Sequence, residues 1–232
     1  MTTLAATFNA ADKTTPGHYG PCQTALLLLD FHSMFVQRAG VPQAPAALSV
    51  AARMRTWAKS QGIQVIHCLL DINATPFPTC KDADRLVGIA AAMKSGGGSE
   101  EPTELLEGGG DDLDITFTRT PGHVSALKSP GLEDFLGKKG IKSLVLTGLS
   151  TSGCVMRTAV TASDAEYVVS VISDGCADQA EDVHEMMVGK VCNNRGYVVT
   201  AAEFQEGFAK VMGENEGFWK GAEGRIFSFL LR

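Results

Sequence analysis

The amino-acid sequence predicts an α/β protein, a three-layer α/β/α sandwich around a six-stranded, mostly parallel sheet. Three observations predict this class. Six short runs are almost continuously apolar, as is typical of parallel strands that helices bury on both faces. A helical pattern follows each run, so strands and helices alternate. The chain has 232 residues, 44% of them hydrophobic, which is enough for one large core.

The predicted strands are rich in leucine, valine and isoleucine, as in ALLLLD, IQVIHCLL and KSLVLTG. In chain order they cover residues 25–30, 63–70, 113–118, 142–148, 166–173 and 197–200. The segments between them carry apolar residues at helical spacing. They predict helices over residues 44–62, 81–94, 130–140, 152–165, 178–191 and 201–212. Gly62 is the expected end of the first helix, because glycine adopts the left-handed conformation that ends many helices.

Two segments lie outside this alternation. Residues 1–21 precede the first strand and are expected to form an N-terminal arm, whereas residues 22–232 form a single domain. Residues 95–112, SGGGSEEPTELLEGGGDD, are rich in glycine and acidic residues, which predicts a surface insertion outside the core. This insertion is either a flexible loop or a functional segment, such as a lid or a subunit contact.

Composition excludes several classes of partner. The net charge of −6 gives no basic surface for nucleic acid or for an anionic membrane. No apolar run approaches the roughly 20 residues that span a bilayer, and the first residues do not resemble a signal peptide. The six cysteines are scattered without metal-finger spacing, which favours reduced thiols and a cytoplasmic location.

Candidate catalytic residues lie where the predicted strands end, because ligands of open α/β sheets bind at that edge. Cys154 opens a helix, whose N-terminus favours a thiolate and offers N–H groups to an oxyanion. Asp30 ends the first strand and is a candidate base for the thiol proton. Arg119 ends the third strand and supplies a cation. Each residue alone has a structural alternative, a buried cysteine or a helix-capping aspartate, and their combination favours catalysis.

Three stretches of the chain carry a resemblance to a known family. LVLTGLSTSGCVMRTAVTASDA resembles the nucleophile signature of the isochorismatase-like cysteine hydrolases, a superfamily that includes nicotinamidases, carbamoylsarcosine amidohydrolases and biuret hydrolases. LLLLDFHSMF resembles its first strand with the catalytic aspartate, and VVSVISDGCAD its fifth strand. The resemblance covers nearly all of the chain from about residue 22.

The resemblance implies a role for particular residues. Cys154 matches the nucleophile and Asp30 the base. The Leu149–Ser150 bond matches a cis peptide of the family, and the N–H groups of Ser150 and Cys154 then form the oxyanion hole. The family's third catalytic residue is a lysine, in whose place this chain has Arg119. Arginine keeps its charge and binds a carboxylate through a planar fork, but it cannot donate a proton at neutral pH.

The resemblance also implies whether a metal is bound and which residues contact the substrate. Metal-using nicotinamidases carry an Asp-x-His pair after strand 2, where this chain has Asp71 and Asn73, so we predict no metal and no cofactor. Lys128 is the alternative catalytic cation. The predicted substrate-binding residues, for several of which core packing is an equal alternative, are Phe31, His32, Phe35, His123, Leu149 and Thr151.

The predicted function is hydrolysis of a small amide, ureido or carbamoyl substrate, at a C–N bond other than a peptide bond, through a thioester on Cys154. The resemblance also implies a homo-oligomer, a dimer or a tetramer. Two alternatives remain. One is vinyl-ether hydrolysis of isochorismate, and the other is a non-catalytic member that binds a metabolite or a protein partner.

Overall fold

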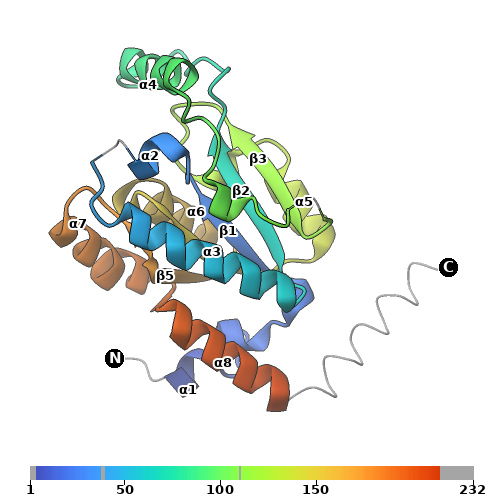
Figure 1. Ribbon diagram of the computed structural model, residues 1–232. Coiled ribbons are helices and arrows are strands. Elements are labelled where there is room, and N and C mark those ends of the chain that lie inside the picture. Colours follow the sequence, from blue (N-terminus) through green and yellow to red (C-terminus); the bar gives the residue numbers. More distant parts are fainter. Residues whose placement is uncertain (1–3, 38–39, 110, 215–232) are drawn as a thin grey trace.

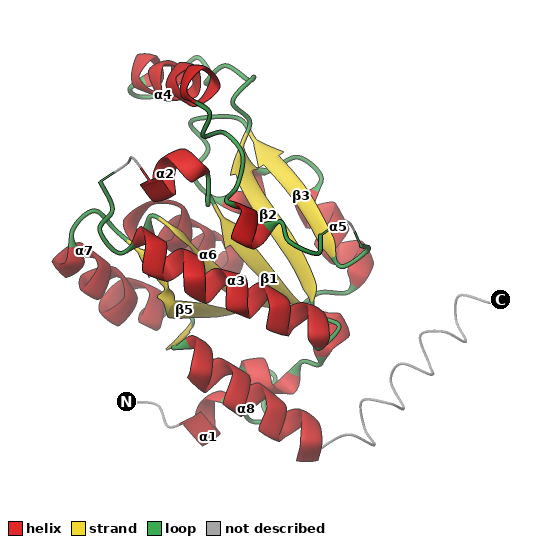
Figure 2. Ribbon diagram, in the orientation of Figure 1, coloured by secondary structure: helices red, strands yellow, loops and turns green. Residues whose placement is uncertain are grey.

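The computed structural model of the protein describes residues 4–37, 40–109 and 111–214. A single twisted sheet forms its middle layer (Figure 2). The strands are β1 (Thr24–Leu29), β2 (Gln64–Leu70), β3 (Asp114–Arg119), β4 (Ser143–Leu149), β5 (Val168–Ala177) and β6 (Tyr197–Val199). Their order in the sheet is β3-β2-β1-β4-β5-β6, and every neighbouring pair is parallel. The predicted fold class is confirmed, with a sheet that is parallel throughout.

The helices follow the predicted alternation, and two short ones were not predicted. They are α1 (Leu4–Thr7), α2 (Ser33–Gln37), α3 (Ala44–Ser60), α4 (Ala83–Gly96), α5 (Leu132–Lys139), α6 (Met156–Asp164), α7 (Glu181–Met186) and α8 (Ala201–Glu214). Gly62 has φ of +74° two residues beyond the end of α3, as its sequence position predicted. No helix of the described residues is long and apolar enough to cross a membrane.

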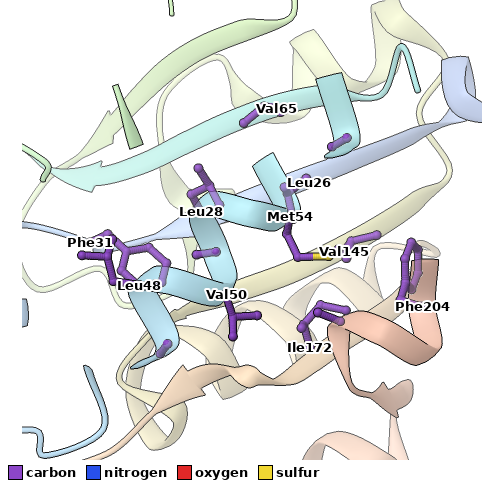
Figure 3. Close-up of a cluster of buried hydrophobic side chains, with 14 of the residues drawn as sticks. Leu26, Leu28, Phe31, Leu48, Val50, Met54, Val65, Val145, Ile172 and Phe204 are labelled. Carbon is purple, nitrogen blue, oxygen red and sulfur yellow. The ribbon is translucent and has the colours of Figure 1, made fainter. Parts of the chain in front are cut away.

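The core has two halves, one on each face of the sheet. Along β1 the side chains of Leu26 and Leu28 face α3, whereas those of Leu27 and Leu29 face the opposite layer with α5 and α6. In the first half, Met54 of α3 packs among strand residues such as Leu26 and Val145 (Figure 3). Burial on both faces explains why the strand is apolar from Ala25 to Leu29.

Strand β5 is longer than predicted. Its pairing with β4 shifts register between Leu146 and Gly148, and the strand continues to Ala177. Asp174, expected at the end of this strand, therefore lies within it, and its Oδ1 accepts a hydrogen bond of 2.8 Å from the N–H of Ala201 at the start of α8. The irregularity explains the error, because a pattern of apolar residues does not reveal a bulge.

The N-terminal arm packs against the last helix. Phe8 is buried, and its ring lies edge-on to that of Phe204 of α8, with centroids 5.3 Å apart. Gly207 of α8 leaves room for the Phe8 ring, since a Cβ at Gly207 would lie 2.2 Å from it. Figure 1 shows α1 and α8 side by side below the sheet.

The insertion at residues 95–112 is exposed over most of its described length, as the prediction of a surface excursion requires, but some of its side chains are buried. Leu105 is fully buried, and so is the carboxylate of Glu101, whose Oε2 lies 2.8 Å from Nδ1 of His67 on β2. The other ring nitrogen of His67 lies 2.8 Å from Oδ1 of Asp114, which also pairs with Arg55 of α3. Composition predicted solvent exposure for Glu101, but an acidic residue can be buried where it has such partners.

Candidate active site

The sheet order places two catalytic candidates next to each other. Strands β1 and β4 are neighbours at the centre of the sheet, and the chain leaves their carboxyl ends at Asp30 and Ser150. This crevice is where an open α/β sheet binds its ligand. Asp30 is held in place by its N–H, which donates to the carbonyl of Cys68 at 2.9 Å. Its φ of +57° lies in the left-handed region, which non-glycine residues seldom adopt.

Arg119, the last residue of β3, contacts both Asp30 and Cys154. Its Nη1 donates to Oδ1 of Asp30 at 2.9 Å and its Nη2 to Oδ2 at 2.5 Å, a bidentate ion pair. The same Nη2 lies 3.5 Å from Sγ of Cys154. Its Nε donates to the carbonyl of His123 at 3.0 Å. All the guanidinium nitrogens therefore have partners, and the structure brings Asp30, Arg119 and Cys154 together in the interior.

The carboxylate of Asp30 favours the charged form of Arg119. Burial works against the charge of Arg119, but the carboxylate of Asp30 outweighs burial and raises the pKa of Arg119 above its ordinary value. Asp30 is 5% exposed and Arg119 2% exposed, so water screens their attraction little.

The thiol of Cys154 is less acidic than its place on a helix suggested. Burial, and after it the negative charge of Asp30, raise the pKa of Cys154 well above its ordinary value, although Arg119 opposes the shift. The helix argument favoured a thiolate, but it took no account of the missing solvent or of the neighbouring carboxylate. Sγ also lies 3.7 Å from Oγ1 of Thr158, one turn further along the helix. The direction of this shift favours the neutral thiol of Cys154 over the thiolate.

The turn that carries Cys154 differs from a regular helix start. Residues Thr151–Val155 form a π-helical turn before α6, and the Leu149–Ser150 peptide bond is cis, as the resemblance implied. The N–H of Ser152 donates to Oδ2 of Asp178 at 2.6 Å. Asp178 follows β5, so it connects the turn that carries Cys154 to the end of the neighbouring strand.

A cavity of about 550 Å³ opens above these groups. Asp30, Arg119, Ser150 and Cys154 line one part of it. Three of the six predicted substrate-binding residues also line it, namely Phe35, His123 and Leu149. A volume of this size lies within the range of roughly 300–1,000 Å³ that is common for small-molecule sites.

The other three predicted substrate-binding residues are not on the cavity wall. Phe31 is fully buried in the core beneath α3. His32 is 1% exposed, and its ring connects two backbone groups, the carbonyl of Ser99 at 2.6 Å and the N–H of Leu70 at 3.1 Å. Thr151 is buried, and its Oγ1 lies 2.8 Å from Nδ1 of His184. These side chains support the site from behind, which sequence adjacency to Asp30 and Cys154 did not distinguish from facing it.

Helix α4 supplies a wall of the cavity that the sequence did not predict. In Figure 1 it stands beyond the ends of β2 and β3, apart from the helices that cover the sheet. The lining residues from this region are Lys81, Arg85, Leu86, Ile89, Ala90 and Met93. Their spacing of three and four residues was the available signal for one helix face, but nothing in it showed that this face meets the catalytic edge.

The structure also bears on Lys128 as the alternative cation and on side chains that could hold a metal ion. Lys128 is exposed at the end of a short 3₁₀ helix and does not line the cavity, so Arg119 is the cation that meets Asp30. Within the described ranges, no three His, Cys, Asp or Glu side chains are grouped to hold a metal ion.

Comparisons with known proteins agree with this architecture. A sequence model of the isochorismatase domain family matches residues 24–203. Maleamate amidohydrolase of Pseudomonas putida is 27% identical over 180 residues, which are 76% of this chain and 82% of that protein.

Solved structures extend the similarity of the fold. A cysteine hydrolase from Pseudomonas syringae superposes with a TM-score of 0.69 at 16% identity, over 83% of this chain and 95% of that one. N-carbamoylsarcosine amidase from Thermoplasma acidophilum gives a TM-score of 0.58 at 20% identity, over 77% and 96% of the respective chains.

Proposed function

The chain belongs to the isochorismatase family of hydrolases, and we propose that it cleaves a C–N bond of a small amide, ureido or carbamoyl substrate with Cys154 as nucleophile. The observation that carries the proposal is the buried group in which one nitrogen of Arg119 contacts both Asp30 and Cys154. A nucleophile, a base and a cation on one cavity wall are the parts that acyl transfer needs. The relative that acts as an amidohydrolase supports this reaction class.

The neutral thiol determines the first step. Because burial and Asp30 raise the pKa of Cys154, the proton leaves as Sγ attacks the carbonyl carbon, and Asp30 accepts it. The N–H groups of Ser150 and Cys154 stabilise the oxyanion. Asp30 then gives the proton to the leaving nitrogen, and the C–N bond breaks to leave a thioester. Water, deprotonated by Asp30, attacks the thioester, the C–S bond breaks to release the acid, and Asp30 returns the proton to Sγ of Cys154.

Arg119 contributes charge and orientation in this scheme. Its guanidinium remains protonated throughout, so every proton transfer belongs to Asp30. The bidentate pairing fixes the carboxylate, and the 3.5 Å contact with Sγ places positive charge where a thiolate develops. Neither a metal nor a cofactor takes part in these steps.

A substrate panel with matched variants tests the proposal. The panel contains small amides, ureides and N-carbamoyl compounds, together with isochorismate. The variants are Cys154→Ala and Cys176→Ala, since Cys176 is a buried cysteine of the same core half. We expect turnover of a C–N substrate by the wild type and by Cys176→Ala, and its loss in Cys154→Ala.

Two other outcomes would replace the proposal. Hydrolysis of isochorismate that persists in Cys154→Ala would indicate the vinyl-ether reaction. A wild-type protein that turns over no panel compound, and whose Cys154 resists iodoacetamide, would indicate a non-catalytic binding protein.

A further inference from the structure

The charges on the cavity wall are unbalanced. Four charged side chains line it, namely Asp30, Lys81, Arg85 and Arg119. Asp30 and Arg119 neutralise each other in the bidentate pair. Lys81 and Arg85 form no ion pair with any described residue. The wall therefore carries two positive charges that no described residue neutralises, and because both side chains are exposed, solvent weakens but does not remove their attraction for an anion.

The segment that carries the two cations contacts the turn after β3, which contains Gly122 and His123. Cys80, next to Lys81, packs on the turn after β3, since a Cβ at Gly122 would lie 2.7 Å from its Sγ. The ring of His123 in that turn lies 4.9 Å from the ring of Phe77. The carbonyl of His123 in turn holds Nε of Arg119. A short chain of contacts thus connects the start of α4 to the catalytic ion pair.

Beyond the cations, the same face of α4 is apolar. Leu86, Ile89 and Met93 recur at intervals of three and four residues and all line the cavity. The acidic neighbours Asp82 and Asp84 are exposed, as the cations are, but unlike the cations they do not line the cavity. One wall therefore offers two cations followed by an apolar surface.

We propose that the substrate is an anion with an apolar body, whose carboxylate binds Lys81 and Arg85 while its scissile carbonyl lies at Cys154. The inference rests on the proposed function and adds a substrate class to it. The body lies along Leu86, Ile89 and Met93. Lys81 and Arg85 then determine specificity, because a neutral substrate of the same shape gains nothing from their charge.

Alkylation with isosteric reagents tests the charge preference without a known substrate. The probes are 4-(iodoacetamido)butanoate and its neutral carboxamide, 4-(iodoacetamido)butanamide. Peptide mapping gives the ratio of their rates at Cys154, with exposed Cys22 as the internal reference. We expect the carboxylate to be preferred at Cys154 by roughly fivefold relative to Cys22, within the range that two solvent-exposed ion pairs supply.

Matched variants assign the preference to the two cations. Lys81→Gln/Arg85→Gln should abolish it, whereas Lys94→Gln/Lys138→Gln should keep it, because these exposed lysines do not line the cavity. Added salt should weaken it, since exposed charges are screened over about 10 Å at 0.1 M. An equal ratio at Cys154 and Cys22 would contradict the inference.

A binding measurement separates this inference from the proposed reaction. The Kd of hexanoate and of hexanamide is measured by calorimetry on Cys154→Ser, which needs no turnover and no alkylation. Tighter binding of hexanoate that depends on Lys81 and Arg85 supports the anion site even where the substrate panel shows no hydrolysis. Equal binding of the two probes would overturn the anion site and leave the cysteine mechanism standing.

Discussion

At the scale of single residues, Asp30 has two opposing effects on Cys154. Its carboxylate is the proposed proton acceptor, and after burial its charge is the main cause that raises the pKa of the thiol. We therefore expect Asp30→Asn to lower the pKa of Cys154 and to speed its alkylation at pH 8. The same variant should lose about 10²–10⁴-fold in turnover, the usual contribution of a general base.

The control for this prediction is Asp71→Asn. Asp71 follows β2, but it does not line the cavity. Rates of alkylation and of turnover on the same samples measure both effects. Slower alkylation of Cys154 in Asp30→Asn would contradict the assigned electrostatics.

The buried ion pair predicts a stability effect. Arg119→Met leaves the carboxylate of Asp30 buried without its partner, which typically costs about 3–5 kcal/mol. The double variant Asp30→Asn/Arg119→Met should recover much of that loss, because no charge then remains unpaired. Urea unfolding measures both, and Arg53→Met, at an exposed position of α3, serves as the control with a change of about 0.5 kcal/mol or less. Equal losses in the single and double variants would contradict the pairing argument.

The catalytic candidates were predictable because they stand at sequence landmarks. Asp30, Arg119 and Cys154 each follow an apolar run, and parallel strands bring such ends to one edge. His32 and Thr151 stand beside the same landmarks, yet their side chains face backbone groups and His184. The direction of a side chain in a loop depends on long-range partners such as Ser99, which no local pattern contains. For the same reason the sequence did not predict that Thr158 contacts Sγ of Cys154 or that Asp178 accepts a hydrogen bond from Ser152.

At the scale of elements, His67 anchors the insertion. Burial alone would lower the pKa of His67, but hydrogen bonds and charges of Glu101 and Asp114 outweigh it and raise the pKa. Asp114 also faces Arg55 and Lys59 of α3. A raised folded-state pKa means that the stabilisation is complete below the ordinary value of about 6.5 and is lost as pH rises through the folded-state value.

We therefore expect hydrogen exchange of residues 98–107 to show less protection at pH 9 than at pH 6, after correction for intrinsic rates. Helix α5, which packs on the face of the sheet opposite to α3 and Leu105, should keep its protection and serve as the internal control. His67→Gln should remove the pH dependence. Equal protection of the insertion at both pH values in the wild type would argue against His67 as its anchor.

The contact between the arm and α8 predicts opposite effects of one substitution at two glycines. Gly207→Ala should destabilise the protein by about 1–3 kcal/mol, because the new Cβ overlaps the ring of Phe8. Gly213→Ala, on the same helix with no atom near its Cβ, should be neutral or stabilising by up to about 1 kcal/mol. Thermal unfolding measures both changes, and equal values at the two positions would mean that Phe8 does not pack there in solution.

Strands were predictable and the arm was not, for one physical reason. A strand segment buried on both faces, such as residues 25–29, must be apolar throughout, so its pattern is local. Phe8 is a single aromatic residue in a polar segment, and its partners Phe204 and Gly207 lie about two hundred residues further along the chain. The burial of Glu101 likewise depends on distant His67.

At the scale of the whole molecule, the sheet order explains where function lies. Strands β1 and β4 place Asp30 and Cys154 at the centre, β3 extends Arg119 towards them, and α4 closes one side of the cavity. The carboxyl edge of the sheet thus holds the proposed catalytic residues, and α4 carries part of the proposed selectivity site. A homo-oligomer and a cytoplasmic location stay predictions. Light scattering, which gives the mass of the protein in solution, tests the first of them.

The central claim is that hydrolysis passes through a thioester on Cys154, and acid-quenched mass spectrometry during turnover tests it most directly. Acid stops deacylation, so an acyl group carried by the enzyme is retained and can be mapped to one peptide. We predict a mass increase equal to the acyl part of the substrate, located on Cys154 and absent from Cys154→Ala. Turnover by Cys154→Ala at the wild-type rate, with no acyl group on the wild-type cysteine, would contradict the account.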